Sequence, residues 1–184
     1  MEPIIIDDGR TLLKITIEEV AKLHEELIDG KPCICVSSSF RAAQLAFSKL
    51  WHEEIPKRDD MKIISALPTE GSQQTFKYIL GERSKEDFRL ELPEGTSVEN
   101  LASHNHVFTF VRKRTNTSIQ VRARPEIFPK EFFQQRKLVE YAIPREETKE
   151  EKEEFEKLER EVRDKFLTLP PGDLFISKIG EVVI

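Results

Sequence analysis

Several features that mark common protein classes are missing from this chain. It has only 2 cysteines among 184 residues, too few for a disulfide-stapled secreted scaffold. No apolar run approaches the length of a membrane-spanning segment, and the first residues lack a basic stretch followed by an apolar one. Basic residues are not in excess, because the net charge is −5, which argues against bulk nucleic-acid binding. We therefore expect a cytoplasmic protein with no membrane partner and without nucleic acid as its main partner.

The composition is that of a small folded protein with a charged surface. With 38% hydrophobic residues in 184, the chain can bury one core. We expect one α+β domain over residues 1–145, in which residues 82–104 form a loop or insertion. Residues 146–184 would add a C-terminal helix and terminal strand, which we expect to serve dimerisation.

Hydrophobic periodicity and turn residues predict the order of elements. The order is helix–strand–helix–strand–helix followed by a β-hairpin, which indicates a mixed sheet with helices packed on one face and a long charged C-terminal helix. The expected elements are a short hairpin within 4–15, a helix from Thr16 to Gly30, a strand at Cys33–Val36, a helix over 40–51, a strand at Met61–Leu67, a helix at Ser72–Leu80, a hairpin of 107–111 and 118–121, helices over 130–141 and 146–166, and a strand pair or extended tail over 174–184.

The segment from Asp29 to Arg41 holds both thiols of the chain, on Cys33 and Cys35. On a strand these side chains would face the same way, but a disulfide between them is awkward, so we expect reduced thiols. Two interpretations are open. The cysteines are ligands or reactive thiols, or they are small buried residues of the strand, since free cysteine is among the most buried residue types.

Two predicted strand-to-helix turns carry hydroxyl side chains. One of three serines should cap the helix after Cys33–Val36, and a crossover through that helix would make this strand parallel to Met61–Leu67. Both turns would then lie at the carboxyl ends of the strands, where open sheets bind ligands. We expect a pocket there for a small anionic ligand, with ordinary helix capping as the alternative. Its residues would be Cys33, Ser37, Ser38, Ser39, Arg41, Thr69, Glu70 and Ser72.

Three stretches resemble the FmdE-like family of formylmethanofuran dehydrogenase components, over roughly residues 16–180. Aligned on Arg41, the first stretch lies where the family carries His-Gly-His-x-Cys-Pro-Gly and then Gly-Tyr-Arg-Ala-Ala; Gly30, Cys33, Arg41, Ala42 and Ala43 match, and Phe40 replaces the tyrosine. The second is the hairpin from Phe108 to Val121, with Asn116 at the turn glycine, and the third is Leu174-Phe175 after a long charged helix. The resemblance implies one-carbon metabolism, in which carbon dioxide is reduced onto methanofuran with the molybdenum or tungsten chemistry on other subunits, and it makes dehydrogenase subunits candidate partners.

The chain departs from the family where the family is usually taken to bind zinc. Asp29 and Lys31 occupy the histidine positions, no second cysteine follows near Thr69–Ser72, and no paired-cysteine zinc ribbon is present. Four protein ligands, or three and a water, are needed for zinc. We therefore expect no cofactor and a non-catalytic accessory or binding module that has lost the metal site. The alternative is a zinc-binding protein or metal-dependent enzyme that uses ligands drawn from Asp29, Cys33, Cys35, His104 and His106.

Two surface features suggest partners. Arg112, Arg114, Arg122 and Arg124 make the hairpin basic; we expect a solvated face or pairing with the acidic helix 146–161, and nucleic-acid binding stays open as an alternative. Along the C-terminal helix, Phe155, Leu158, Val162 and Phe166 form a narrow apolar stripe. The stripe must dock on its own domain or across a dimer axis, and we expect a homodimer.

Overall fold

The computed structural model describes residues 1–24, 27–141 and 147–181. The helices are α1 (Ile17–His24), α2 (Ile34–Leu50), α3 (Glu70–Leu80), α4 (Ser84–Asp87), α5 (Phe132–Tyr141), α6 (Lys149–Thr168) and α7 (Pro171–Leu174). The strands are β1 (Ile4–Asp7), β2 (Leu12–Ile15), β3 (Leu27–Ile28), β4 (Lys31–Pro32), β5 (Met61–Ser65), β6 (Phe88–Leu90), β7 (Val107–Arg112), β8 (Thr117–Ala123) and β9 (Phe175–Glu181). Short 3-10 turns connect several of them.

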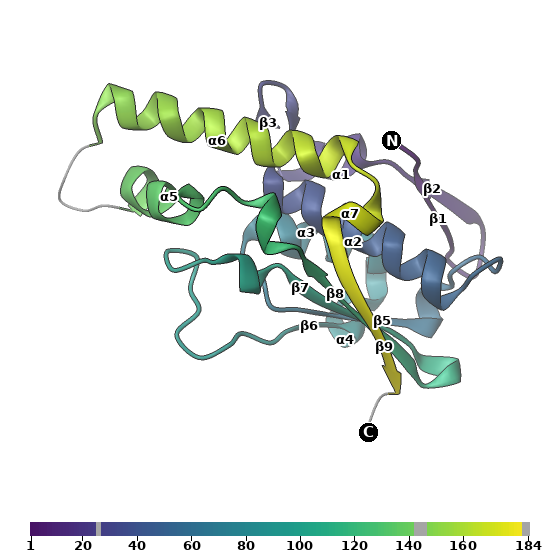
Figure 1. The fold of residues 1–184 in the computed structure, drawn as a ribbon. Coiled ribbons are helices and arrows are strands. Elements are labelled where there is room, and N and C mark those ends of the chain that lie inside the picture. Colours follow the sequence, from purple (N-terminus) through teal and green to yellow (C-terminus); the bar gives the residue numbers. More distant parts are fainter. Residues whose placement is uncertain (25–26, 142–146, 182–184) are drawn as a thin grey trace.

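A five-stranded mixed sheet organises the molecule. Its strand order is β6-β5-β7-β8-β9, with β6 parallel to β5 and the other neighbours antiparallel. Burial alternates along β8, where Ile119, Val121 and Ala123 are buried and Gln120 and Arg122 are exposed, as expected for a sheet covered on one face. Helices α2 and α3 pack on that covered face (Figure 1). The α+β class, the mixed sheet and the helices on one face are therefore confirmed.

Aromatic rings fill the space between the sheet and its helices. Phe76 of α3 lies edge-on to Phe108 and Phe110 of β7, with ring centroids 5.2 and 5.7 Å apart. Phe47 of α2 meets Phe110 at 5.8 Å. Each such pair adds about 0.5–1.5 kcal/mol beyond its buried area. The rings thereby fix α2 and α3 against the sheet and against each other.

The strand predicted at Cys33–Val36 is wrong. Cys33 is the N-cap of α2, with an extended backbone, and its sulfur accepts a hydrogen bond from the Val36 amide. The following residues are helical, and Ser37, Ser38 and Ser39 lie buried inside the helix and do not cap it. A short apolar run is equally consistent with a buried strand and with the start of a buried helix. Here the helix prevails because α2 is covered on most sides by α1, α3, α6 and the sheet.

The strand that separates α1 from α2 lies a few residues earlier. Helix α1 ends at His24, so Gly30 does not cap it; β3 and β4 form a small hairpin instead. Asp29 and Gly30 make its turn, each with positive φ. This hairpin is separate from the main sheet, so the predicted parallel pairing with Met61–Leu67 is also wrong.

The other predicted elements survive with small changes. The hairpin of β7 and β8 is confirmed, and Asn116 takes the left-handed conformation at its turn. Gly81 closes α3 with φ 59°. Residues 82–104 are not only a loop, because they include α4 and the edge strand β6. At the other edge, β9 is a single strand paired with β8.

The long helix α6 packs on its own chain. Phe155, Leu158, Val162 and Phe166 are all buried, and α6 contacts α2 and α5 (Figure 1). Arg163 and Arg160 reach Asp29 in the β3–β4 turn, with N–O distances of 3.7 and 3.3 Å. The stripe is therefore covered without a second copy, and a homodimer stays a prediction.

The basic hairpin is not simply a solvated face. Arg112 is buried and pairs with Asp60 and Glu54, and not with the acidic helix. The prediction is wrong because Arg112 shares the inner face of β7 with the buried Phe108 and Phe110 and ends its strand beside the buried carboxylate of Asp60. Among the described residues, no helix is both long and apolar enough to cross a bilayer.

Candidate ligand cavity at the start of α2

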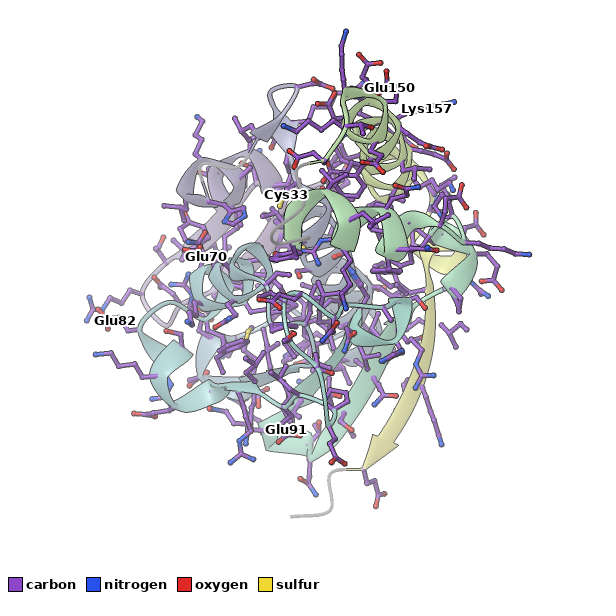
Figure 2. All side chains as sticks on the ribbon, turned by 90° about the vertical axis from the view of Figure 1, so that its left-hand side faces the viewer. Cys33, Glu70, Glu82, Glu91, Glu150 and Lys157 are labelled. Carbon is purple, nitrogen blue, oxygen red and sulfur yellow. The ribbon has the colours of Figure 1, made fainter. Side chains whose placement is uncertain are left out.

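A cavity of about 450 Å³ lies where α2 and α3 begin and α5 and α6 cover them. Its lining comes from segments far apart in the sequence, and Figure 2 shows its labelled member Cys33 inside the molecule beneath the C-terminal helices. The lining residues are Leu27, Cys33, Ile34, Cys35, Thr69, Val98, Leu101, His106, Phe132, Phe133, Arg136, Glu140, Tyr141 and Glu159. Apolar and polar side chains contribute about equally to the wall, which combines aliphatic and aromatic surface with charged groups.

The first turn of α2 brings both thiols to this cavity. Cys33 caps the helix, with its Sγ 3.5 Å from the Val36 amide nitrogen. Cys35 follows one residue into the helix and is partly exposed, whereas Cys33 is only 7% exposed. The N-terminus of a helix carries partial positive charge and unpaired N–H groups. Thiolate or ligand anions are therefore stabilised at this position.

A second helix begins at the same cavity. Thr69 is the N-cap residue of α3, but its side chain makes no capping hydrogen bond. The residue is only 8% exposed, and its hydroxyl oxygen forms no hydrogen bond of normal geometry among the described residues, although it lies near the Cys35 sulfur and helps to lower the pKa of that thiol. An unsatisfied buried hydroxyl costs about 1–3 kcal/mol. The wall of the cavity thus contains an uncapped helix start and a buried hydroxyl that lacks a well-formed hydrogen bond.

The two thiols differ in acidity. Hydrogen bonding from Cys33, with help from the Thr69 hydroxyl and the Arg136 charge, lowers the pKa of Cys35 in spite of its burial. The pKa of Cys33 is raised, because its proton is shared with Cys35 and because its surroundings are dry. The pair therefore loses its first proton from Cys35 and keeps the second on Cys33.

His106 lies on the inner wall in a ring of aromatic side chains. Its Nδ1 is 3.2 Å from the Ser38 hydroxyl, which donates its own proton to the Cys35 carbonyl. Nδ1 must then be the protonated nitrogen, which leaves Nε2 as an acceptor. Burial lowers the pKa of His106 to about 3, helped by the nearby Arg136. The imidazole is neutral at physiological pH and is a poor base.

Charged residues of α5 and α6 form the remaining wall. The Arg136 guanidinium is 2.8 Å from the Glu140 carboxylate, and it also donates to the Tyr141 hydroxyl at 3.0 Å. Burial, reinforced by the Glu140 charge, raises the pKa of Glu159 to about 7. The charge of this wall therefore changes near neutral pH.

The structure gathers only some of the predicted ligand-binding residues. Cys33 and Thr69 line the cavity, and so does Cys35, predicted as a metal ligand. The buried hydroxyls lie behind the wall: Ser37 donates to the Pro32 carbonyl, Ser38 contacts His106, and Ser39 donates to Ser72. Glu70 is exposed at the start of α3 (Figure 2), and Arg41 binds the Leu169 carbonyl away from the cavity.

The candidate metal ligands are also divided. Cys33, Cys35 and His106 line one cavity, whereas Asp29 pairs with two arginines of α6 and His104 is exposed. Within the described ranges, histidine, cysteine and carboxylate side chains do not form a group of three or more that could hold a metal ion. This donor set does not fit the four-ligand geometry of zinc.

The wall from α5 and α6 was missed by sequence reasoning. Arg136 and Glu140 are four residues apart and close to Phe132 and Phe133, so they share one helix face with an aromatic pair. A charged pair beside aromatic residues on a short helix was the available signal. Nothing in the sequence connected that face with Cys33, about one hundred residues earlier.

Known proteins provide one informative match. No protein-family model and no curated protein matches the sequence. The fold matches the crystal structure of a tungsten formylmethanofuran dehydrogenase FmdE-like protein from Syntrophus aciditrophicus, with a TM-score of 0.51, 14% identity, and coverage of 97% of this chain and 77% of that chain. At this identity the likeness establishes the fold. The resemblance inferred from three sequence stretches is thus confirmed at the level of architecture: this chain has the fold of an FmdE-like protein.

Proposed function

We propose that this chain is an FmdE-like binding module that holds a small molecule with an anionic group in the cavity at the start of α2. The observation that carries the proposal is the uncapped start of α3, where the buried Thr69 hydroxyl lies near the Cys35 sulfur and forms no hydrogen bond of normal geometry among the described residues. Two helix N-termini and the Arg136 guanidinium meet at this cavity, and all three favour an anion, although Arg136 is paired with Glu140 and Glu159 lies in the same wall. The role is accessory and non-catalytic.

The shape of the cavity indicates the rest of the ligand. Phe132, Phe133 and Leu101 contribute apolar surface to the same cavity. A cavity of about 450 Å³ is in the range of small-molecule sites. An aromatic or aliphatic body attached to a carboxylate would place its charge at Thr69 and its body against the phenylalanines.

Benzoate is the probe that tests this proposal. In a titration followed by the amide resonances of the protein, benzoate should shift the signals of residues 33–35 and 69–72. Benzamide, which has the same ring without the charge, should bind more weakly. Saturable shifts confined to other surfaces, or equal binding of both probes, would refute the proposal.

Thr69→Val removes the hydroxyl while keeping the shape of the side chain. We expect it to weaken benzoate binding about tenfold or more, because a hydrogen bond to a charged group contributes about 1.5–3 kcal/mol. Thr109→Val is the matched control, since Thr109 lies half-buried on β7 and outside the cavity. If Thr69→Val leaves the affinity for benzoate unchanged, the Thr69 hydroxyl does not take part in binding.

The second candidate function is metal binding, because Cys33, Cys35 and His106 line one cavity, although among the described residues they do not form a group of three that could hold a metal ion. Elemental analysis of the purified protein separates the two candidates. Stoichiometric zinc that is lost in Cys33→Ala would support the metal-binding protein, and folded metal-free protein would contradict it. A homodimer and association with dehydrogenase subunits are further proposals, to be tested by light scattering after size-exclusion chromatography and by co-purification.

A further inference from the structure

Two cysteine side chains share one helix turn at the floor of the cavity. Cys33 and Cys35 flank a single residue at the start of α2, and both line the cavity. Their sulfurs are close enough to share a hydrogen bond. Cysteines that serve only as small core residues would have no reason to meet each other beside a cavity. The geometry of a strand, which makes a disulfide between them awkward, does not apply here, because Cys33 is the extended N-cap residue and Cys35 lies in the first helical turn. Their arrangement is that of a dithiol.

The two sulfurs differ in their surroundings, and we expect them to react in a fixed order. Cys35 is the more exposed residue of the two, although burial opposes the ionisation of its thiol, and the Thr69 hydroxyl and Arg136 lie near its sulfur. Cys33 is more deeply buried and its sulfur is occupied as the cap of the Val36 amide. We therefore expect Cys35 to react first with a substrate in the cavity, and Cys33 to react in the second step. This order is the one that a nucleophilic thiol and a resolving thiol require.

We propose that Cys33 and Cys35 form a redox-active dithiol that reduces a small-molecule disulfide bound in the cavity. The inference rests on the proposed ligand-binding function and adds the chemical class of the ligand, a disulfide with an anionic group. Since each chain carries one dithiol and is consumed by one turnover, the protein acts as a reductant or sensor and not as a catalyst.

The reaction balances in two steps. The Cys35 thiolate attacks one sulfur of the substrate, whose S–S bond breaks; a mixed disulfide forms and the first product thiolate leaves. Cys33 then gives its proton to solvent and attacks the Cys35 sulfur, so that the mixed disulfide breaks and the second product thiolate leaves. The protein loses two electrons and two protons, and the substrate becomes two thiols.

The test uses 5,5′-dithiobis(2-nitrobenzoate), an aromatic disulfide with carboxylates, on the full native chain. The wild type should release two thionitrobenzoate ions and end without an adduct, lighter by two hydrogen atoms in mass spectrometry. Cys33→Ser should release one ion and retain one adduct, because the resolving thiol is gone. Cys35→Ser should react at least tenfold more slowly than Cys33→Ser.

Three results would overturn the dithiol: wild-type protein that keeps two adducts, equal rates for the two single variants, or reaction only after unfolding. Serine keeps the size of each side chain and is itself a good cap, and circular dichroism will verify that each variant is folded. Benzoate binding is measured on the same samples. If the protein binds benzoate but does not carry out disulfide exchange, only the dithiol proposal is refuted. If it carries out the exchange but does not bind benzoate, only the anion-binding proposal is refuted.

Discussion

The two ends of α2 differ in how their buried polar groups are paired. At the C-terminal end, Arg112 donates to the Leu50 carbonyl at 3.1 Å, to Asp60 at 3.3 Å and to Glu54 at 2.6 Å. At the N-terminal end, the Thr69 hydroxyl lies near the Cys35 sulfur but forms no hydrogen bond of normal geometry among the described residues, and α3 begins without a side-chain cap. Both ends are buried, but only one of them is satisfied by the protein itself.

The difference separates a structural site from a functional one. A buried charge whose partners are all present holds the fold together and leaves little capacity for a ligand. An unpaired buried hydroxyl beside a cavity costs free energy, and natural proteins keep few such groups without a reason. The comparison therefore favours the thiol end of α2 as the binding site, although Arg112 is the more conspicuous charge in the sequence.

Arg112→Met should produce the largest loss of stability. It leaves the Asp60 carboxylate, only 3% exposed in its side chain, without its arginine, and such a change typically costs about 3–5 kcal/mol. The free energy of unfolding from urea titration measures the loss. Arg114→Met is the control, because the exposed Arg114 contributes only its backbone amide to Asp60 and should change stability little. Equal losses in both variants would show that the C-terminal end of α2 is not held by Arg112.

Gly71→Ala tests how closely α3 packs against α1 and α2 near the N-terminal end of α2, where the thiols lie. A Cβ at position 71 would lie 2.9 Å from His24 Nε2 and 3.1 Å from Val36 Cγ2. Since His24 is buried and bonded to Gln74, overpacking should cost roughly 1–3 kcal/mol. Alanine would also favour the helix by about 1 kcal/mol, which leaves a net loss. At Gly172, where nothing lies within 4 Å of an added Cβ, alanine should not destabilise. A stabilised Gly71→Ala variant would show that α1, α2 and α3 are loosely packed here.

Glu159→Gln should have the smallest effect, and one that depends on pH. Burial, aided by Glu140, raises the pKa of Glu159 to about 7 from 4.5. The folded state therefore binds this proton more tightly than the unfolded chain, so the stability associated with it is present below pH 4.5 and is lost as the pH rises to about 7. Arg136 and Arg163 oppose the shift, and Glu156 adds to it.

In the Glu159→Gln variant this part of the pH dependence should disappear. We expect the variant to be more stable than the wild type at pH 8 by roughly 1 kcal/mol, a value reduced for the part of the side chain that meets solvent. Melting temperatures between pH 4 and 8 measure it. Glu154→Gln, an exposed position on the same helix, is the control. If the melting temperatures of wild type and Glu159→Gln change with pH in the same way, the pKa of Glu159 is not raised by burial.

Local sequence signals predicted the parts of the fold that depend on local chemistry. Asn116 marked the hairpin turn because asparagine tolerates the left-handed conformation found there. Gly81 marked the end of α3 for the same reason. Thr148 begins α6 with a capping box that includes Glu151, close to the helix start expected at residue 146.

Tertiary packing decided the parts that sequence reasoning missed. Residues 33–36 were assigned to a strand because their apolar run is short, and only contacts with other helices show that it starts a buried helix. The convergence of Cys33 with Thr69 was nevertheless anticipated. Both residues precede helices, and the helices lie side by side, so the two N-caps meet although no parallel strand pair joins them. Arg136 and Glu159 reach the same place only through the packing of α5 on α6.

Because a sulfur atom caps α2, the chemical state of Cys33 and the order of that helix are linked. Any reagent that alkylates or oxidises this sulfur weakens the acceptor of the Val36 amide hydrogen. Solvent exchange of that one amide proton should therefore accelerate when the thiol is modified. The exchange rate of the Val36 amide thus reports whether Cys33 is reduced or modified.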